Sequence, residues 1–219
     1  TMSALENIKE LATTAKDLNK KTVAVVGLGA IGSSVVETLA RMGVNLRIID
    51  KDRVYEEDLY KLTLFDATYV SKFKAKEAKK LLENINKDIK VKAFHEELVK
   101  NNAYLVESDV IIDCSSNMDT ALLVDAAAKK IPVVYARAAG TTGCVVIAAE
   151  TRIKQMKNFL EKNVPKGDAK LPTTTRMVAA LAVNKALKLL TGQKYEKNLL
   201  VVDGWKFSIE KVTVRKDKK

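Results

Sequence analysis

The stretch from Val23 to Asp50 limits the fold of this chain more than any other part of the sequence. It begins with an unbroken apolar run, 23–26, of the kind that forms a parallel strand buried on both faces. The glycine-rich run 27–32 (GLGAIG) follows, then apolar residues at helical spacing, and then a second apolar strand that ends at Asp50. This order predicts a strand–helix–strand unit of an α/β fold.

The glycine run has the spacing G-x-G-x-x-G at the junction of the predicted strand and helix. Such glycines let the backbone turn tightly and approach a phosphate, and the first turn of the helix presents free N–H groups to it. Asp50 follows Gly27 by 23 residues, where an acidic side chain can accept hydrogen bonds from ribose hydroxyls. The same spacing occurs in tight turns that bind nothing, but here the flanking elements agree with a ligand site. We therefore predict a nucleotide site and leave the kind of nucleotide open.

The rest of the sequence continues the alternation of strand and helix patterns. The predicted helices span 3–21, 74–84, 119–130, 151–164 and 176–190, with shorter helical pieces near 55–62 and 103–107. The predicted strands span 90–94, 109–114, 132–136, 142–149, 199–203 and 206–214, of which the last two form a hairpin. The helix at 176–190 is apolar nearly all round between Met177 and Val183, so it should be buried. The expected fold is α/β and Rossmann-like, a mostly parallel sheet flanked by helices with an antiparallel C-terminal extension.

Composition narrows the class of protein. The 219 residues can bury a full α/β core, and no segment approaches the ~20 apolar residues of a membrane span. With only Cys114 and Cys144 a disulfide framework is not expected, and a reducing cytoplasm fits best. The net charge of +11 fits solvated lysines or a general attraction for anionic ligands. No recognisable nucleic-acid motif accompanies it, so we expect neither nucleic acid nor a membrane as a partner.

Polar residues gather where the predicted strands end, which is where open α/β sheets bind ligands. Asp50 and Asp52 follow the second strand, and the turn 115–117 follows a later one. Lys61 and Lys74 come from the long polar insertion 51–88. Two lysines that face a glycine turn suit a triphosphate better than the less charged pyrophosphate of a dinucleotide. The alternative is that both lysines lie on helix surfaces.

Five segments, taken in order, are similar to one known family. They read VVGLGAIGSSVVETLARMGV, IIDKDRVYEEDLYKL, VSKFKAKEAKKLLENIN, DVIIDCSSN and ALAVNKALKLLTG followed by LLVVDG. They resemble the ThiF/MoeB family, whose adenylating domain also occurs in ubiquitin-activating enzymes. The resemblance implies one adenylating domain over 1–219, with an N-terminal helix at 1–21, a nucleotide-binding core at 22–150 and a C-terminal helix and strand region at 151–219. It also implies a homodimer.

The family's chemistry is attack of a carboxylate on the α-phosphate of ATP, which gives an acyl adenylate and pyrophosphate. Carried over by position, Lys74 would be the phosphate-binding lysine, Lys61 would stand at a position that is usually arginine, and Asp50 would bind the ribose. Because both reactants are anions, cations and alignment supply most of the catalysis. The resemblance implies magnesium and this set of nucleotide contacts: Gly27, Gly29, Ala30, Gly32, Asp50, Asp52, Asp58, Lys61, Lys74, Leu98, Ser116 and Asn117.

Two motifs depart from the family pattern. The family's Asn-Leu-x-Arg-Gln is replaced by residues 58–62, DLYKL, so Lys61 keeps the charge but lacks the two-pronged arginine fork. The family's Cys-Thr-Asp-Asn is replaced by residues 114–117, CSSN, so Ser116 stands where an aspartate helps to hold magnesium. Losing one such group typically costs ~3 kcal/mol of transition-state stabilisation. We hypothesise that Asp113 or Asp119 supplies the missing carboxylate.

Further absences narrow the substrate. Residues 151–219 contain no cysteine, so we expect neither the Cys-x-x-Cys zinc ligands nor the thioester cysteine that some relatives carry. Cys114 and Cys144 are interpreted as structural, and His95 as a surface or strand-end residue. Together with the two altered motifs, these absences favour a small-molecule carboxylate that is itself anionic over the C-terminus of a ubiquitin-like sulfur carrier.

Within the family, this combination resembles the branch called HcgE. That branch acts in making the iron-guanylylpyridinol cofactor of an iron hydrogenase, and it activates the carboxyl group of guanylylpyridinol. An anionic substrate of that kind would suit the basic stretch 152–170. A downstream protein would then accept the acyl group.

Two other classes of protein also fit the sequence. One is an NAD-dependent oxidoreductase with the same glycine fingerprint, against which stand the long insertion 51–88 and the lack of a Tyr-x-x-x-Lys pair. The other is a nucleotide-binding protein that has lost catalysis, which the residues Lys61 and Ser116 would explain.

Overall fold

The structure is a computed structural model that describes residue 8 and residues 15–217. Eight strands form one sheet: β1 (Thr22–Val26), β2 (Asn45–Ile49), β3 (Val91–Phe94), β4 (Val110–Asp113), β5 (Val133–Ala139), β6 (Thr142–Ala148), β7 (Leu199–Asp203) and β8 (Ser208–Val212). The helices are α2 (Ala30–Arg41), α3 (Lys74–Ile85), α4 (Met118–Ala128), α5 (Lys157–Asn163) and α6 (Pro172–Leu190). Short 3-10 helices are η1 (Ala15–Lys20), η2 (Glu56–Asp58), η3 (Ala67–Tyr69), η4 (Lys100–Val106) and η5 (Ile153–Met156).

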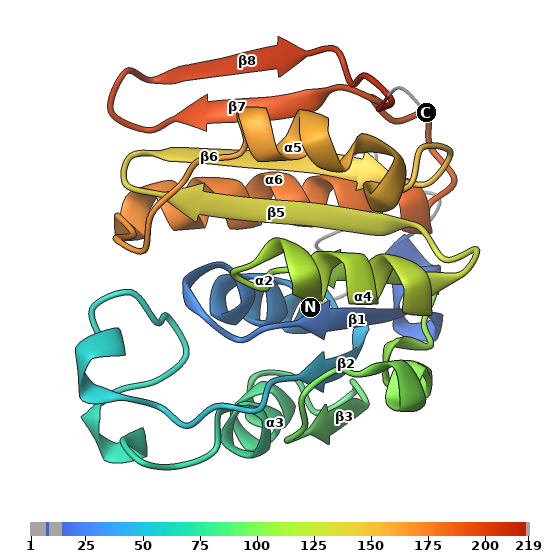
Figure 1. Ribbon diagram of the computed structural model, residues 1–219. Coiled ribbons are helices and arrows are strands. Elements are labelled where there is room, and N and C mark those ends of the chain that lie inside the picture. The colour runs from blue at the N-terminus through green and yellow to red at the C-terminus, as the bar shows by residue number, and fades with distance from the viewer. Residues whose placement is uncertain (1–7, 9–14, 218–219) are drawn as a thin grey trace.

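The strand order is β3-β2-β1-β4-β5-β6-β7-β8. Strands β1 to β5 pair in parallel, and β5 to β8 pair antiparallel, as Figure 1 shows from bottom to top. From β1 the chain builds outward to β2 and β3, and it then returns to place β4 on the other side of β1. The carboxyl ends of β1 and β4 therefore lie at a reversal point of the strand order, where sheets of this kind bind ligands.

Helices cover both faces of the sheet (Figure 1). Residues Val23 and Val25 of β1 pack into one apolar core with α2, α3 and α6, while Ala24 and Val26 pack into a second core with η4, α4 and α5. Because successive side chains of a strand point to opposite faces, a strand between two helical layers has to be apolar throughout. This position between two helical layers explains why all four residues of the run 23–26 are apolar.

The predicted fold is confirmed, and most predicted elements are present with ends shifted by a few residues. The helix expected at 151–164 is divided into η5 and α5, and the pieces expected near 55–62 and 103–107 are 3-10 helices. Of the helix predicted at 3–21, the described part is η1, and residues 1–7 and 9–14 lie outside the described residues.

Helix α6 differs from its prediction in two ways. It begins at Pro172, because proline is well suited to the first turn of a helix, where its missing N–H has no partner to lose. The expectation of burial all round is wrong, since Ala180, Asn184 and Lys188 are exposed along one side. Asn184 and Lys188 follow Ala180 at helical spacing and mark this open side, but Ala180 is apolar and fits a covered or an open position equally well.

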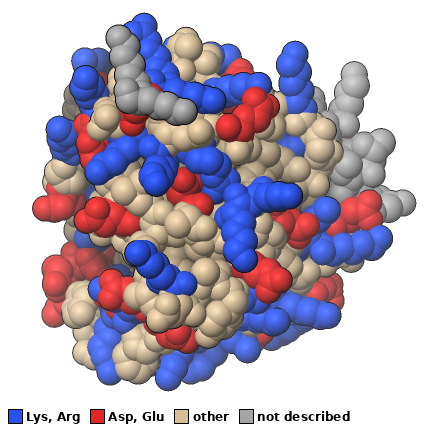
Figure 2. Space-filling view, turned by 45° about the vertical axis from the view of Figure 1, so that its right-hand side comes forward, with Lys and Arg blue, Asp and Glu red and all other residues tan. Residues whose placement is uncertain are grey.

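The positive and negative side chains on the visible surface (Figure 2) are dispersed and form no single charged patch. In the view of Figure 2, Lys and Arg side chains are spread over the whole visible face and are interspersed with Asp and Glu. Within the described residues, no helix is long and apolar enough to cross a membrane.

Candidate functional site

The glycine turn between β1 and α2 is packed tightly against the end of β4. Gly27 adopts a φ of 89°, and a Cβ added there would lie 3.0 Å from the carbonyl oxygen of Cys114. A Cβ at Gly32 would lie 1.8 Å from the carbonyl oxygen of Gly27. A Cβ at Gly29 would meet nothing within 4 Å. Two of the three glycines thus allow the turn to form, and the third keeps open the space in front of it.

Helix α2 starts in that open space. Gly29 is its N-cap residue and makes no side-chain cap, and the amides of a first helical turn have no partner within the helix. They present a positive partial charge to whatever lies before them. Over this 12-residue helix the arrangement suits an anion such as a phosphate.

Asp50 lies at the carboxyl end of β2 and closes the turn from the other side. Its Oδ2 accepts a hydrogen bond of 2.6 Å from the N–H of Leu28, and its Oδ1 accepts one of 2.7 Å from the N–H of Asp52. Burial raises the pKa of the Asp50 carboxyl group, an effect that the Leu28 N–H and the Lys74 ammonium oppose. Each carboxylate oxygen has a second lone pair, so the group can still accept hydrogen bonds from hydroxyls.

The two predicted lysines meet at one carboxylate. Lys74, 5% exposed at the start of α3, places its Nζ 3.5 Å from Oδ2 of Asp58. Lys61 places its Nζ 2.5 Å from Oδ1 of the same residue. Burial disfavours the charged form of Asp58, but the hydrogen bond and charge of Lys61 together with Lys74 lower its pKa overall. The alternative that both lysines are surface residues is wrong, because Lys74 is buried and Lys61 is only half-exposed.

Replacing Asp58 tests whether these lysines are available to phosphates. We expect Asp58→Asn to strengthen MgATP binding by about 3- to 10-fold, because one negative charge near the predicted position of the triphosphate is removed while the shape is kept. The lowered pKa also means that the ion pairs stabilise the fold above the ordinary aspartate pKa of about 3.9 and lose that effect as the pH falls through the lowered value. The variant should therefore show less loss of stability on acidification.

Calorimetry with MgATP and thermal melts between pH 3 and 7 measure the two effects. The matched control is Asp66→Asn in the same insertion. The Asp66 carboxylate accepts hydrogen bonds from Thr68 and forms no ion pair with Lys61 or Lys74. Weaker ATP binding in Asp58→Asn would show that the carboxylate itself assists the nucleotide.

Two cavities open at this edge of the sheet. The small cavity, of about 200 Å³, lies between the ends of β1, β2 and β4. The large cavity, of about 470 Å³, lies between α2, β5 and the segment 164–170. Gly29, Cys114, Ser115 and Ser116 line both, so the two cavities share one wall.

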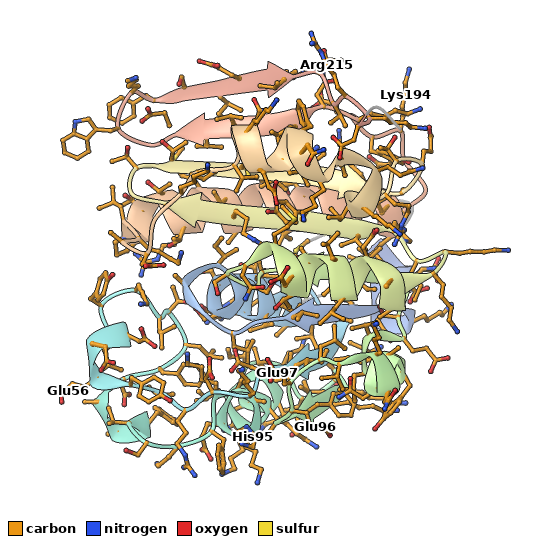
Figure 3. The ribbon with its side chains drawn as sticks, in the orientation of Figure 1. Glu56, His95, Glu96, Glu97, Lys194 and Arg215 are labelled. Carbon is orange, nitrogen blue, oxygen red and sulfur yellow. The ribbon has the colours of Figure 1, made fainter. Side chains whose placement is uncertain are left out.

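The small cavity gathers most of the predicted residues. It is lined by Gly27, Gly29, Asp50, Asp52, Lys74, Leu98, Ser116 and Asn117. Glu96 and Glu97 line it as well, and Figure 3 shows them with His95 just beyond β3. Ala30 lines the large cavity instead. Gly32, Asp58 and Lys61 line neither cavity. Gly32 permits the packing of α2, and Lys61 is connected to Lys74 of the small cavity through Asp58.

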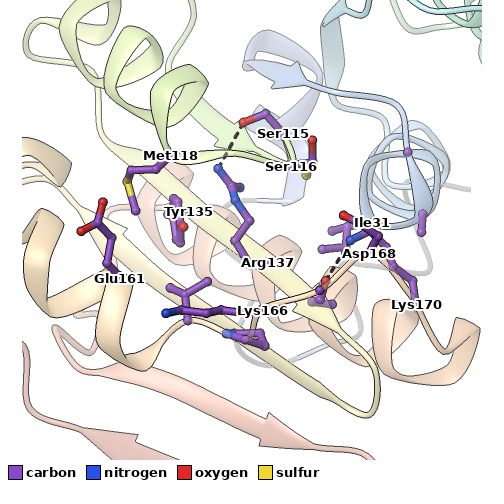
Figure 4. A pocket seen from close by; sticks show the side chains of 17 residues that line it. Ile31, Ser115, Ser116, Met118, Tyr135, Arg137, Glu161, Lys166, Asp168 and Lys170 are labelled. Atoms are coloured by element: carbon purple, nitrogen blue, oxygen red, sulfur yellow. Dashed lines mark hydrogen bonds between the residues drawn. The ribbon is translucent and has the colours of Figure 1, made fainter.

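The large cavity contains residues that the sequence did not single out. Tyr135 and Arg137 project into it from β5, and Lys166 and Lys170 come from the segment before α6 (Figure 4). Nζ of Lys170 donates a hydrogen bond of 3.0 Å to the carbonyl oxygen of Ala138, and burial lowers the pKa of Lys170. The signal that could have revealed Arg137 is a lone charge inside the run 133–139, since a buried charge needs a partner.

The partner of Arg137 is Asp113, which corrects one hypothesis about magnesium. Asp113 is fully buried, its Oδ2 lies 2.9 Å from Nη2 of Arg137, and its Oδ1 accepts a hydrogen bond from the N–H of Ser115. Neither Asp113 nor Asp119 lines the two cavities, and Asp119 is exposed on the first turn of α4. Neither residue is placed to supply the carboxylate that Ser116 lacks. Asp52 is the exposed aspartate that does line the small cavity.

Neither the two cysteines nor the histidine shows a reactive arrangement, although Cys114 lines both cavities. Burial raises the pKa of both the Cys114 and Cys144 thiols, so neither is activated as a thiolate. The ring of His95 packs on that of Phe73, with 3.7 Å between their centroids. Among the residues that the structure describes, no cluster of three or more His, Cys, Asp or Glu could hold a metal ion.

The sequence profile of the ThiF family matches residues 3–219. The chain belongs to the ThiF family. Its match to the sulfur carrier protein ThiS adenylyltransferase of Bacillus subtilis is 30% identical over 204 residues, which is 87% of this chain and 60% of that protein. A sulfur carrier protein adenylyltransferase of Thermus thermophilus is 28% identical over 221 residues, with 91% of this chain and 81% of the relative covered. This ThiF chain thus spans about 60% of the length of its Bacillus relative.

Solved structures confirm the fold of this ThiF chain. PaaA superimposes with a TM-score of 0.79 at 20% identity and covers 96% of this chain and 69% of its own. Escherichia coli MccB solved with ATP superimposes with a TM-score of 0.78 at 19% identity, over 91% of this chain and 65% of its own.

Proposed function

We propose that this ThiF chain is an ATP-dependent adenylyltransferase that activates a carboxylate. The observation that carries the proposal is the pair of cavities that share a wall at the start of α2. One cavity has the groups that a nucleotide needs, and the other opens directly beside the place where an α-phosphate would lie. Two reactants held in adjoining cavities can react without diffusing to one another.

In this proposal ATP occupies the small cavity. Asp50 accepts hydrogen bonds from the ribose hydroxyls, and Leu98 and Asn117 border the adenine end. The phosphates lie before the first turn of α2, with Lys74 and, behind it, Lys61 facing the outer phosphates. Magnesium enters with ATP as part of the substrate, and the Asp52 carboxylate is of the oxygen type that this ion prefers.

The reaction needs no nucleophilic side chain. An oxygen of the substrate carboxylate forms a bond to the α-phosphorus, the bond from that phosphorus to the bridging oxygen breaks, and the electron pair leaves with pyrophosphate. Because negative charge approaches negative charge, the lysines and helix amides contribute by lowering electrostatic repulsion in the transition state. The names of the Bacillus and Thermus relatives, both adenylyltransferases, support this reaction type.

For the substrate we propose a small-molecule carboxylate, with guanylylpyridinol of the HcgE branch as the first compound to test. The large cavity, at about 470 Å³, lies in the size range of small-ligand pockets, and its Lys166 and Lys170 suit an anion. The relatives' names point to a sulfur-carrier protein as the alternative substrate. We further propose that the chain works as a single domain and a cytoplasmic homodimer that passes the acyl group to a protein acceptor.

Exchange of labelled pyrophosphate into ATP tests the proposal. A panel of carboxylates should include guanylylpyridinol, simple aromatic acids and a ubiquitin-like sulfur carrier ending in its free carboxylate. We expect exchange only with magnesium and one class of carboxylate, with the small molecule the best. Exchange with the sulfur carrier alone would keep the reaction type and replace the substrate. MgATP binding without exchange for any of them would favour a protein that has lost catalysis, and tight NADH binding without ATP binding would favour an oxidoreductase.

A further inference from the structure

Ser115 occupies the wall that the small and large cavities share. It follows β4 at the carboxyl end of the sheet, opposite the start of α2. The other members of this shared wall are Gly29, Cys114 and Ser116. The orientation of the Ser115 hydroxyl group therefore bears directly on the proposed chemistry.

The backbone of Ser115 is fixed from behind. Its N–H donates a hydrogen bond of 2.9 Å to Oδ1 of Asp113, whose side chain is fully buried. The other oxygen of Asp113 binds Arg137 at 2.9 Å. A buried ion pair with several hydrogen bonds is a rigid support, because breaking it would leave a charge without a partner.

Arg137 fixes the side chain of Ser115. Its Nη2 lies 3.1 Å from Oγ of Ser115, and this bond is drawn as a dashed line in Figure 4. The same nitrogen lies 3.3 Å from the carbonyl oxygen of Asn117. The other terminal nitrogen, Nη1, donates hydrogen bonds to the carbonyl oxygens of Asp113 and Ala136. The guanidinium group also lies 4.0 Å from the centre of the Tyr135 ring. At 6% exposure, Arg137 is held on all sides.

The direction of the hydrogen bond follows from chemistry. An arginine side chain can only donate, so Oγ of Ser115 must be the acceptor. A hydroxyl group that accepts one hydrogen bond still has its own proton to donate. Among the described residues, none receives a hydrogen bond from Oγ of Ser115, so that proton is left for a ligand in the cavities.

We propose that Ser115 is a catalytic residue of this site, which donates its hydroxyl hydrogen bond to an oxygen of the reacting carboxylate–phosphate pair. Arg137 and Asp113 are positioning residues that orient it. The inference rests on the proposed function. When the carboxylate oxygen bonds to the α-phosphorus, charge gathers on the phosphoryl oxygens, and a donor fixed in advance stabilises that charge. Ser115 keeps its proton throughout, so the electron balance of the reaction is unchanged.

The test is a mutant cycle followed by pyrophosphate exchange and by MgATP binding. We expect Ser115→Ala to lower kcat by about 10- to 100-fold with the Kd of MgATP within about 2-fold of wild type. Ser115→Thr, which keeps the hydroxyl group, should recover most of the activity. Ser208→Ala, on β8 and outside both cavities, is the control that should leave exchange unchanged.

The second arm of the cycle asks whether Arg137 acts through Ser115. Asp113→Asn with Arg137→Met removes the buried pair without leaving a lone charge, and melts confirm folding. In that background Ser115→Ala should change kcat by less than about 3-fold, because the hydroxyl is no longer oriented. Full activity of Ser115→Ala, or an equal loss in both backgrounds, would overturn the assignment while wild-type exchange leaves the proposed function intact. Absence of exchange in the wild type would contradict both.

Discussion

Lys74→Met should lower the rate of carboxylate-dependent pyrophosphate exchange by roughly 100- to 1000-fold, the range seen when one preorganised group for transition-state charge is removed. Lys74 is the buried lysine of the small cavity, and its Nζ is 3.5 Å from Asp58. Methionine keeps the packing of the aliphatic stem at the start of α3 while it removes the charge. Steady-state exchange with the ATP concentration varied is the measurement.

The matched control is Lys80→Met on the same helix. Lys80 is exposed and pairs with Glu77 one turn away on the helix surface, so the activity should stay within about 2-fold of wild type. Because Lys74 also balances the buried Asp50 and the half-buried Asp58 carboxylates, melts are needed to show that the variant is folded at the assay temperature. A folded Lys74→Met with near wild-type exchange would contradict the placement of the triphosphate.

The second large effect is a contrast between two alanine substitutions in the glycine turn. Gly32→Ala places a methyl group 1.8 Å from the Gly27 carbonyl oxygen, so β1 and α2 must move apart. We expect a loss of about 3 kcal/mol of stability, or a fall in Tm of roughly 6–12 °C for a chain of this length. ATP binding should weaken as well, because the turn is distorted.

Gly29→Ala should behave in the opposite way. Its methyl group meets no protein atom within 4 Å and enters the space where both cavities meet. Stability should change by less than about 1 kcal/mol, while MgATP affinity falls on the order of 10- to 100-fold, since hydrogen bonds from the backbone to a charged phosphate are lost. Thermal melts measure the stability of both variants, and calorimetry measures their affinity for MgATP. Unchanged ATP affinity in Gly29→Ala would mean that the phosphates do not approach α2.

Much of the fold could be predicted because its causes are local. The run 23–26 is apolar throughout since it lies between two helical layers, and the glycines at 27 and 32 are required by close packing. The spacing from Gly27 pointed to Asp50, whereas Lys74 was expected from the family resemblance, and both residues line the small cavity. The exposed side of α6 was missed because Ala180 fits a covered or an open position equally well.

The site was harder to predict where its contacts join distant segments. The bond between Asp113 and Arg137 crosses from β4 to β5, and nothing in the spacing of the two residues announces that they pair. The hypothesis that Asp113 or Asp119 supplies the magnesium carboxylate rested on closeness in sequence to Ser116. It is wrong because Asp113 pairs with Arg137 in the protein interior and Asp119 is exposed on the first turn of α4. The large cavity combines β5 with the segment 164–170, and only the fold brings these together.

In the proposed reaction a carboxylate attacks the α-phosphorus of ATP. With the carboxylate that supports exchange labelled with ¹⁸O, and hydroxylamine added to take the acyl group, mass spectrometry of the nucleotide product measures the point of attack. The proposed reaction predicts AMP that carries one ¹⁸O atom from the carboxylate, together with unlabelled pyrophosphate. Formation of ADP with the label in inorganic phosphate would show attack at the γ-phosphorus and would contradict it.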